Sequence, residues 1–200
     1  MSVLFCNNNS MSAITSTPSG IGGGSMALIS TQTASSSSTI TFTSGIDSTY
    51  KEYIFKFINI HPESDDQDFE FQVDTGTNTN FNQQITSTVF RAYNNEAANA
   101  NALSYATSSD LANGTGFQRI MANMDNDNDS NGAGTLHLFD PSSDTFVKHF
   151  IARTQYSYPV NSFNQFTTGY INTATAITRV RFKMESGNID SGTIKLYGIS

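Results

Sequence analysis

Asp68-Phe69-Glu70-Phe71-Gln72-Val73-Asp74 alternates polar and apolar residues at every step. Successive side chains of an extended strand point to opposite faces. This order therefore places the apolar side chains on one face and the polar side chains on the other. The stretch predicts a β-strand with one buried face.

Alternating or largely apolar runs recur along the chain and predict further strands. These are Thr39–Thr43, Tyr53–Ile60, Thr88–Tyr93, Gly134–Phe139, Phe146–Tyr156, Arg179–Met184 and Thr193–Tyr197. Polar turn sequences such as His61–Asp66 and Asp140–Asp144 lie between them. Short strands separated by polar turns are typical of a β-sandwich or barrel. We therefore expect an all-β fold, a β-sandwich or barrel, over residues 27–200.

Two segments differ from the simple alternating pattern. Tyr53–Ile60 is largely apolar, which predicts a central strand that is covered on both faces. Asn95–Leu111 is rich in Ala but also in Asn and Ser, and it is compatible with either a short helix or a long loop.

The composition excludes several classes of protein. Only 14% of the residues are charged while 12% are aromatic, which is the opposite of a disordered chain. The formal net charge of −7 argues against a nucleic-acid partner, because such affinity comes largely from Lys and Arg at the phosphates. No apolar run approaches the length of a membrane-spanning helix, and Met1–Ser10 lacks the pattern of a secretory signal. The single cysteine, Cys6, excludes an internal disulfide framework.

The first 26 residues form a separate segment in this interpretation. No Asp, Glu, Lys or Arg precedes Asp47, and Ser19–Ser25 reads as a glycine-rich hinge. A polar segment with few apolar residues cannot build its own core. Residues 1–26 are therefore either a disordered tail or an attachment arm that orders against a partner. The arm residues expected to contact the partner are Asn7, Met11, Ile14 and Ile21.

One acidic stretch resembles the first half of a calcium-binding loop. Asp127, Asp129 and Asn131 stand at positions one, three and five of such a loop, and Gly132 stands at the sharp turn. Position twelve, which normally carries a bidentate carboxylate, is Leu138. The stretch is either a calcium site completed by distant residues or a solvated turn, and no other cofactor is expected.

Other chemical signatures are weak. His137 and His149 fall in two predicted strands joined by one loop, where they could face each other and supply half of a zinc site. Cys6 has no neighbouring base or cation to activate it. The sequence contains no phosphate-binding loop, nucleophile elbow or zinc-protease motif. We therefore expect no enzyme.

Arg179, Arg181 and Lys183 form the only cationic stripe. They alternate with apolar residues and so share one face of a predicted strand. The stripe is either an ordinary solvated face or a row that pairs with Asp68, Glu70 and Asp74 across a sheet or a subunit boundary.

Several strand-and-turn motifs resemble small virion structural proteins of marine tailed bacteriophages, of the tail-fibre-like or decoration type. The motifs are Ser30–Ile40, Gly45–Lys51, Gly134–Pro141, Thr145–Phe150 and Ser186–Gly198. The resemblance covers residues 26–200, and the last motif is similar to the final strand of phage appendage jelly rolls. The resemblance therefore implies an antiparallel jelly-roll-like β-sandwich over residues 27–200. Motifs of this kind imply a fold and a context but transfer no catalytic residue.

The resemblance implies a non-enzymatic virion protein, a surface-exposed tail-fibre or capsid-decoration module whose arm docks on other virion proteins of the capsid or tail. A homotrimer is expected, with a host surface glycan as a further partner and with neither nucleic acid nor membrane insertion. The alternative is a carbohydrate-binding adhesin module. Because the chain has no Trp, tyrosines would have to stack on the sugars. A polysaccharide depolymerase is a third, weaker alternative, which would need a pair of acids in a cleft.

Overall fold

The computed structural model describes residues 26–200, and these residues form twelve β-strands and no helix. The strands are β1 (Met26–Ser37), β2 (Ile40–Phe42), β3 (Glu52–Pro62), β4 (Gln67–Thr75), β5 (Ile85–Asn95), β6 (Asn101–Tyr105), β7 (Gln118–Met124), β8 (Gly132–Phe139), β9 (Lys148–Tyr158), β10 (Asn161–Ile171), β11 (Ile177–Met184) and β12 (Ile189–Ile199). Within this part of the chain, no helix is present that could cross a membrane.

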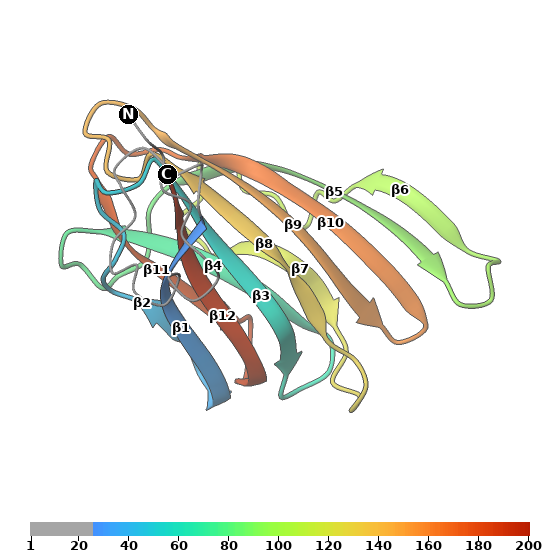
Figure 1. The fold of residues 1–200 in the computed structure, drawn as a ribbon. Coiled ribbons are helices and arrows are strands. Elements are labelled where there is room, and N and C mark those ends of the chain that lie inside the picture. Colours follow the sequence, from blue (N-terminus) through green and yellow to red (C-terminus); the bar gives the residue numbers. More distant parts are fainter. Residues whose placement is uncertain (1–25) are drawn as a thin grey trace, which may run out of the picture.

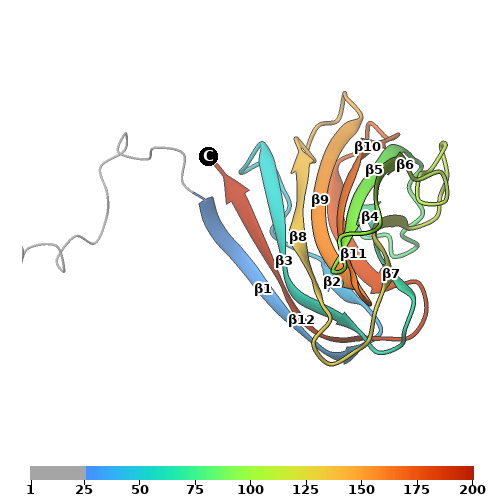
Figure 2. The same cartoon turned by 90° about the vertical axis from the view of Figure 1, so that its right-hand side faces the viewer.

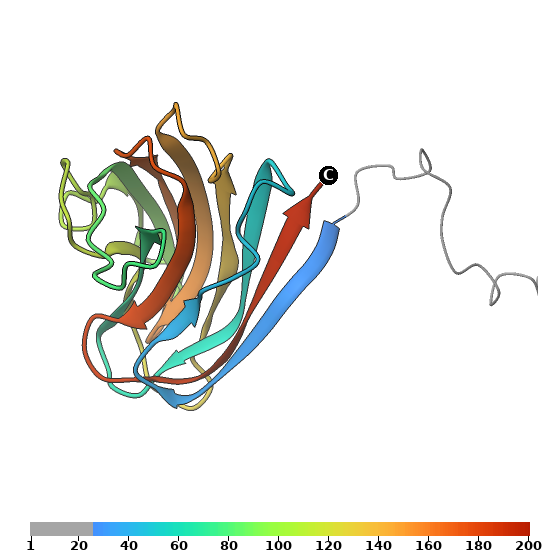
Figure 3. The same ribbon diagram turned by 90° about the vertical axis from the view of Figure 1, so that its left-hand side faces the viewer.

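The strands form two antiparallel sheets packed as a sandwich. The large sheet has the order β1-β12-β3-β8-β9-β10-β5-β6, and the small sheet has the order β2-β11-β4-β7. Figure 1 shows the large sheet running from β1 to the β5–β6 hairpin, and Figures 2 and 3 view the two layers from opposite sides. Only the β5–β6, β8–β9 and β9–β10 connections stay within one sheet. The predicted all-β sandwich is confirmed.

An aromatic cluster fills the space between the sheets. Phe182 of β11 lies at its centre, with its ring centroid 5.2 Å from that of Phe55 and 5.3 Å from that of Phe57. Three further rings, those of Phe42, Phe69 and Phe71, lie within 6.4 Å of Phe182. Burial of large aromatic side chains is the main stabilising term of such a core, and edge-to-face pairs add to it.

Strand β4 departs from its prediction on one point. Its alternation is as expected, yet both faces are buried. On its polar face, Gln72 and Asp74 contact backbone groups of the loop that follows β4 and of the loop that precedes β7, whereas Asp68 and Glu70 pair with Arg119 and Lys183. Burial of these polar groups is tolerated because each of them is hydrogen-bonded or paired with a cation.

The other two expectations for individual segments need correction. Strand β3 is central in its sheet, as predicted, but no second layer formed by residues 26–200 covers its outer face, where Ile58 is exposed. Asn95–Leu111 contains no helix; it forms a turn, strand β6 and further turns. Cross-strand hydrogen bonds between β6 and β5 satisfy the backbone there, so the high helix propensity of Ala is overridden.

Candidate functional site

The outer face of the large sheet carries the candidate site. The inner face packs on the small sheet, whereas no second layer covers the outer face over the described residues. Side chains that point outward from β5, β9 and β10 include Phe90 and Ile151, which are 39% and 45% exposed. Large exposed apolar side chains gathered on one face are a recognised mark of an interaction site.

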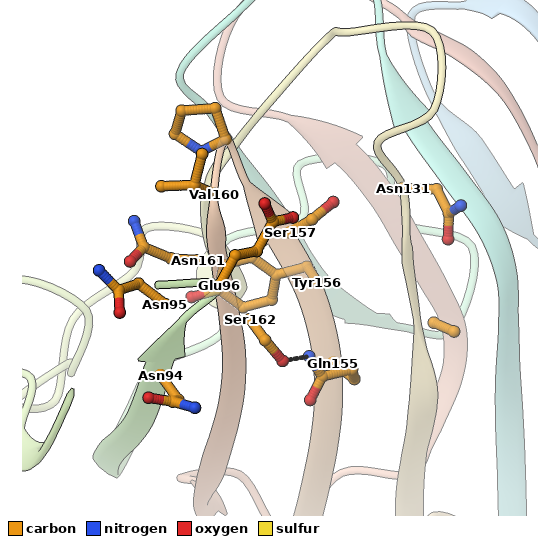
Figure 4. Close-up of a pocket in the computed structure, with 12 residues that line it drawn as sticks. Asn94, Asn95, Glu96, Asn131, Gln155, Tyr156, Ser157, Val160, Asn161 and Ser162 are labelled. Atoms are coloured by element: carbon orange, nitrogen blue, oxygen red, sulfur yellow. Dashed lines mark hydrogen bonds between the residues drawn. The ribbon is translucent and has the colours of Figure 1, made fainter. Parts of the chain in front are cut away.

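A polar hollow of about 430 Å³ lies at the β9–β10 hairpin. Figure 4 shows Asn94, Asn95 and Asn161 on one side of this hollow and Asn131 on the other. On its floor, Gln155 Nε2 donates a hydrogen bond of 2.7 Å to Ser162 Oγ, which holds the Gln155 amide in place. The hollow therefore offers several amide donors and acceptors and one carboxylate, that of Glu96.

Two further hollows lie along β9 and β10; the second shares lining residues with the first, and the third shares none with either. The next, of about 300 Å³, shares Ala133 and Gln155 with the first and extends to Arg153. The last, of about 440 Å³, is lined by Phe139, His149, Phe150, Ile151, Thr168, Gly169 and Tyr170. From Ser157 to His149 the strand advances roughly 26 Å at about 3.3 Å per residue. We call these three hollows together the outer groove.

Aromatic and cationic side chains flank the outer groove. The rings of Phe90 and Phe166 stack with centroids 5.0 Å apart and an interplanar angle of 11°. The Arg153 guanidinium lies 5.0 Å above the Phe166 ring, and the His149 and Tyr170 rings are 6.2 Å apart. These rings are held by neighbouring strands of one sheet, so their spacing is preorganised.

Two pairs of polar side chains on this face are already bonded to each other. His137 Nδ1 lies 2.6 Å from Glu52 Oε1, so the single acid on the outer face of β3 is already engaged. At the sheet edge the Tyr105 hydroxyl donates to Asp110 Oδ2 at 2.5 Å, and this hydrogen bond raises the pKa of Tyr105. Amides, hydroxyls and ring faces in successive hollows along one face are suited to hydrogen-bond and stack against sugar rings.

The predicted calcium loop connects β7 to β8. The Asp125 carboxylate holds this loop in place. The residue is 6% exposed, and its carboxylate accepts hydrogen bonds from Ser130 Oγ and from the Asp127 backbone amide. The Asp127 and Asp129 side chains are exposed, and the Asp127 carbonyl accepts a hydrogen bond from His61 Nε2. Asn131 borders the outer groove instead. The calcium site on Asp127, Asp129 and Asn131 stays a prediction.

The two strand histidines do not face each other. His137 is opposite Ile151 in the β8–β9 register, and its ring nitrogen is taken by Glu52, whereas His149 contacts Tyr170. Over residues 26–200, no three side chains of His, Cys, Asp or Glu are gathered closely enough to hold a metal ion.

The cationic stripe of β11 lies within the small sheet. Arg179 and Lys183 lie opposite Asp74 and Glu70 in the β11–β4 register, and Lys183 Nζ is 2.7 Å from Glu70 Oε1. Arg181 lies 3.8 Å above the ring of Phe81. Over the described residues, pairing across the sheet is therefore found for Lys183 and Glu70 alone: Arg179 Nε donates to the Gly76 carbonyl, and Asp68 pairs with Arg119 of β7.

The predicted arm contacts at Asn7, Met11, Ile14 and Ile21 lie outside the described residues. Of the residues that line the outer groove, Asn131 was selected from sequence as a calcium ligand, His149 as half of a zinc site, and Tyr156 and Tyr170 as tyrosines that could stack on sugars. A usable signal was present, because β9 alternates buried Phe150, Ala152 and Thr154 with outward His149, Ile151 and Arg153. Such outward residues are informative only once it is known that nothing covers that face.

Comparison with known proteins adds no further constraint. The sequence matches no protein family model, no curated protein and no solved structure at a significant level.

Proposed function

We propose that this chain is a non-enzymatic attachment module, a surface component of a bacteriophage virion that meets a host surface glycan through the outer groove. The tail-fibre or capsid-decoration context rests on the strand-and-turn motifs of the sequence. The glycan-binding activity rests on the groove itself. The jelly-roll-like description of the sandwich belongs to this proposal, and it is supported by a chain that crosses between the sheets at most connections.

The observation that carries the proposal is the composition of the groove along its length. One end is lined by amides and hydroxyls, the middle by Arg153 and Thr135, and the other end by the rings of Phe139, His149 and Tyr170. Sugars need both kinds of group, because their hydroxyls require hydrogen-bond partners and their ring faces stack on aromatic side chains. An extended groove on a rigid sheet suits a linear saccharide, since little ordering of the protein is needed on binding.

A glycan array tests the proposal. The full chain is expected to bind bacterial surface polysaccharides, and Asn94→Ala and Gln155→Ala are expected to weaken that binding. Asn80→Ala is the matched control, because Asn80 is an exposed asparagine in the loop after β4, away from the groove. An array without hits, or equal losses in Asn94→Ala and Asn80→Ala, would contradict a glycan-binding groove.

A second candidate function, assembly of copies into a larger structure, is favoured by the edges of the large sheet. Strand β1 is an edge strand of twelve residues without a charged side chain. Natural edge strands are usually blunted by charge or proline, because their free backbone groups pair with other chains. Only one register shift, between Leu28 and Ser30, interrupts β1.

Sedimentation of the full chain tests the assembly function and the expected homotrimer. Thr33→Lys places a charge on the exposed middle of β1 and is expected to shift any oligomer toward the monomer. The same substitution at Thr79, which lies in the exposed loop after β4, is the control. A monomer at all concentrations would contradict assembly through β1.

A further inference from the structure

The next inference rests on the glycan-binding function proposed above and specifies the class of glycan. We propose that the outer face takes an acidic polysaccharide, whose carboxylate or sulfate groups lie on Arg153, Lys56 and Lys195 while its sugar rings lie on the neighbouring aromatic side chains.

The strand register places these cations in one row. Arg153 of β9 is opposite Thr135 of β8, Thr135 is opposite Lys56 of β3, and Lys56 is opposite Lys195 of β12. Residues directly opposite in an antiparallel pair point to the same face. All four side chains therefore lie on the outer face, and the row crosses the outer groove where Arg153 and Thr135 line it. Figure 1 shows these four strands as neighbours in the large sheet.

The same row continues with aromatic side chains on the other side of Arg153. Phe166 is opposite Arg153, Phe90 is opposite Phe166, and Tyr105 is opposite Phe90. Across the six strand spacings from Tyr105 to Lys195 the row measures about 29 Å. One half of it is aromatic and the other half is cationic, so a polysaccharide that crosses the strands here meets stacking rings on one side of the outer groove and cations on the other.

The positions of Lys56 and Lys195 are unfavourable for the stability of the fold. Lys56 and Lys195 are directly opposite each other, and like charges at such positions are destabilising. Within the described residues neither lysine nor Arg153 has a carboxylate within 4 Å, although acids outnumber bases in this chain by 17 to 10. The nearest outward acid on β3, Glu52, is engaged by His137. An anionic ligand supplies the missing counter-charges.

Contacts with rings keep two of the cations on this face. The Lys56 ammonium lies 5.3 Å above the ring of Tyr197, and the Arg153 guanidinium lies 5.0 Å above that of Phe166. Both head groups are thus held beside an aromatic face while their hydrogen-bond donors stay free for a ligand oxygen.

The overall charge selects between two kinds of polyanion. Nucleic acid carries a charge on every phosphate and would be repelled by a molecule with a net charge of −7. An acidic polysaccharide has more widely spaced charges and uncharged ring faces between them. The small number of cations and their position beside aromatic rings fit the polysaccharide better.

Binding of the full chain to immobilised polymers tests this inference. The probes are polygalacturonate, dextran sulfate, uncharged dextran and a single-stranded thymidine oligonucleotide, each at 50 and 300 mM NaCl. Wild type is expected to bind the two acidic polysaccharides and to lose affinity at the higher salt. Lys56→Gln combined with Lys195→Gln is expected to lower that affinity about fivefold, as two exposed ion pairs would. Lys51→Gln is the control, because Lys51 is an exposed lysine outside the row.

Thermal unfolding of the same variants separates binding from folding. The double lysine variant is expected to melt no lower than wild type, because it removes a like-charge contact. Arg153→Gln, which changes an exposed side chain, is expected to weaken binding independently.

Each contrary outcome has a distinct meaning. If a neutral polysaccharide binds equally well and the lysine variant is unaffected, the acidic class is wrong while glycan binding stands. If neither acidic nor neutral polysaccharide binds at either salt concentration and the glycan array also shows no hits, both proposals fail. Tighter binding of the oligonucleotide than of the acidic polysaccharides would overturn the polysaccharide in favour of nucleic acid.

Discussion

Replacing Lys183 by methionine tests the role of the polar layer on the outer side of the small sheet. Lys183 Nζ lies 2.7 Å from Glu70 Oε1, and the Glu70 side chain is only 8% exposed. Lys183→Met keeps most of the side-chain volume but leaves a buried carboxylate without its counter-charge. Removal of one partner of a fully buried pair costs about 3–5 kcal/mol. Because the Lys183 side chain is 26% exposed, we expect a loss of about 2–3 kcal/mol in the free energy of unfolding at pH 7.

The loss of stability in Lys183→Met is expected to depend on pH. Burial raises the pKa of Glu70 above its usual value, and the hydrogen bond and charge of Lys183 oppose that rise. Without Lys183 the pKa of Glu70 rises further, so the folded state binds a proton more tightly than the unfolded state does. Stability of the variant therefore increases as the pH falls through the carboxyl range, and its deficit relative to wild type shrinks.

Urea unfolding followed by circular dichroism at pH 4.5, 6 and 8 measures the effect. Adding Glu70→Gln to the Lys183→Met variant should recover part of the loss, because the buried charge is gone. Lys51→Met is the matched control: its partner Asp140 is 2.8 Å away, but the two side chains are 76% and 43% exposed, so less than about 1 kcal/mol should be lost. A Lys183→Met deficit that equals that of Lys51→Met, or that is the same at all three pH values, would refute the reasoning.

Three further substitutions test the core and the buried backbone. Phe182→Ala should cost about 3–5 kcal/mol in urea unfolding, since it opens a cavity among five neighbouring rings. Gly169→Ala should destabilise the protein strongly, because the new Cβ would lie 2.3 Å from a backbone oxygen of β5. Gly116→Ala is the control, because its new Cβ would meet nothing closer than 4.0 Å. A similar melting temperature for the two variants would contradict the close approach of β10 to β5 at Gly169. Burial lowers the pKa of Lys148, and within residues 26–200 its side chain makes a single hydrogen bond, to the Thr173 carbonyl. Replacing this buried charge in Lys148→Met should therefore stabilise the fold by about 1 kcal/mol at pH 7. That gain should shrink as the pH approaches the usual lysine value, because Lys148 then loses its charge in both states of the wild type; a gain as large at pH 10 as at pH 7 would speak against a charge effect.

Local alternation was sufficient to predict several strands with one apolar face, although β7, whose buried face carries Ile120, Ala122 and Met124, was missed. The runs Asp68–Asp74, Thr88–Tyr93 and Arg179–Met184 were all predicted in this way and lie in β4, β5 and β11. Strand β10, with the sequence Asn161–Ile171, was not predicted, because its inner face carries Gln165, Thr167 and Gly169 in place of large apolar residues. The side chains of Gln165 and Thr167 are tolerated in the interior because they hydrogen-bond to the Arg119 carbonyl, and Gln165 also accepts a hydrogen bond from the Tyr156 hydroxyl. The sequence pattern does not reveal these distant partners.

The sequence by itself determined the all-β class, most of the strands and the two faces of each, because side-chain direction alternates along any extended chain. Only the tertiary structure decided which of those faces meets solvent. The acids of β4 alternate as cleanly as the outward residues of β9, yet Glu70 is buried against Lys183 while Arg153 is exposed beside Phe166. Neighbours in a sheet come from distant parts of the chain, so the row that brings Lys56, Lys195 and Arg153 together depends on the order and register of the strands.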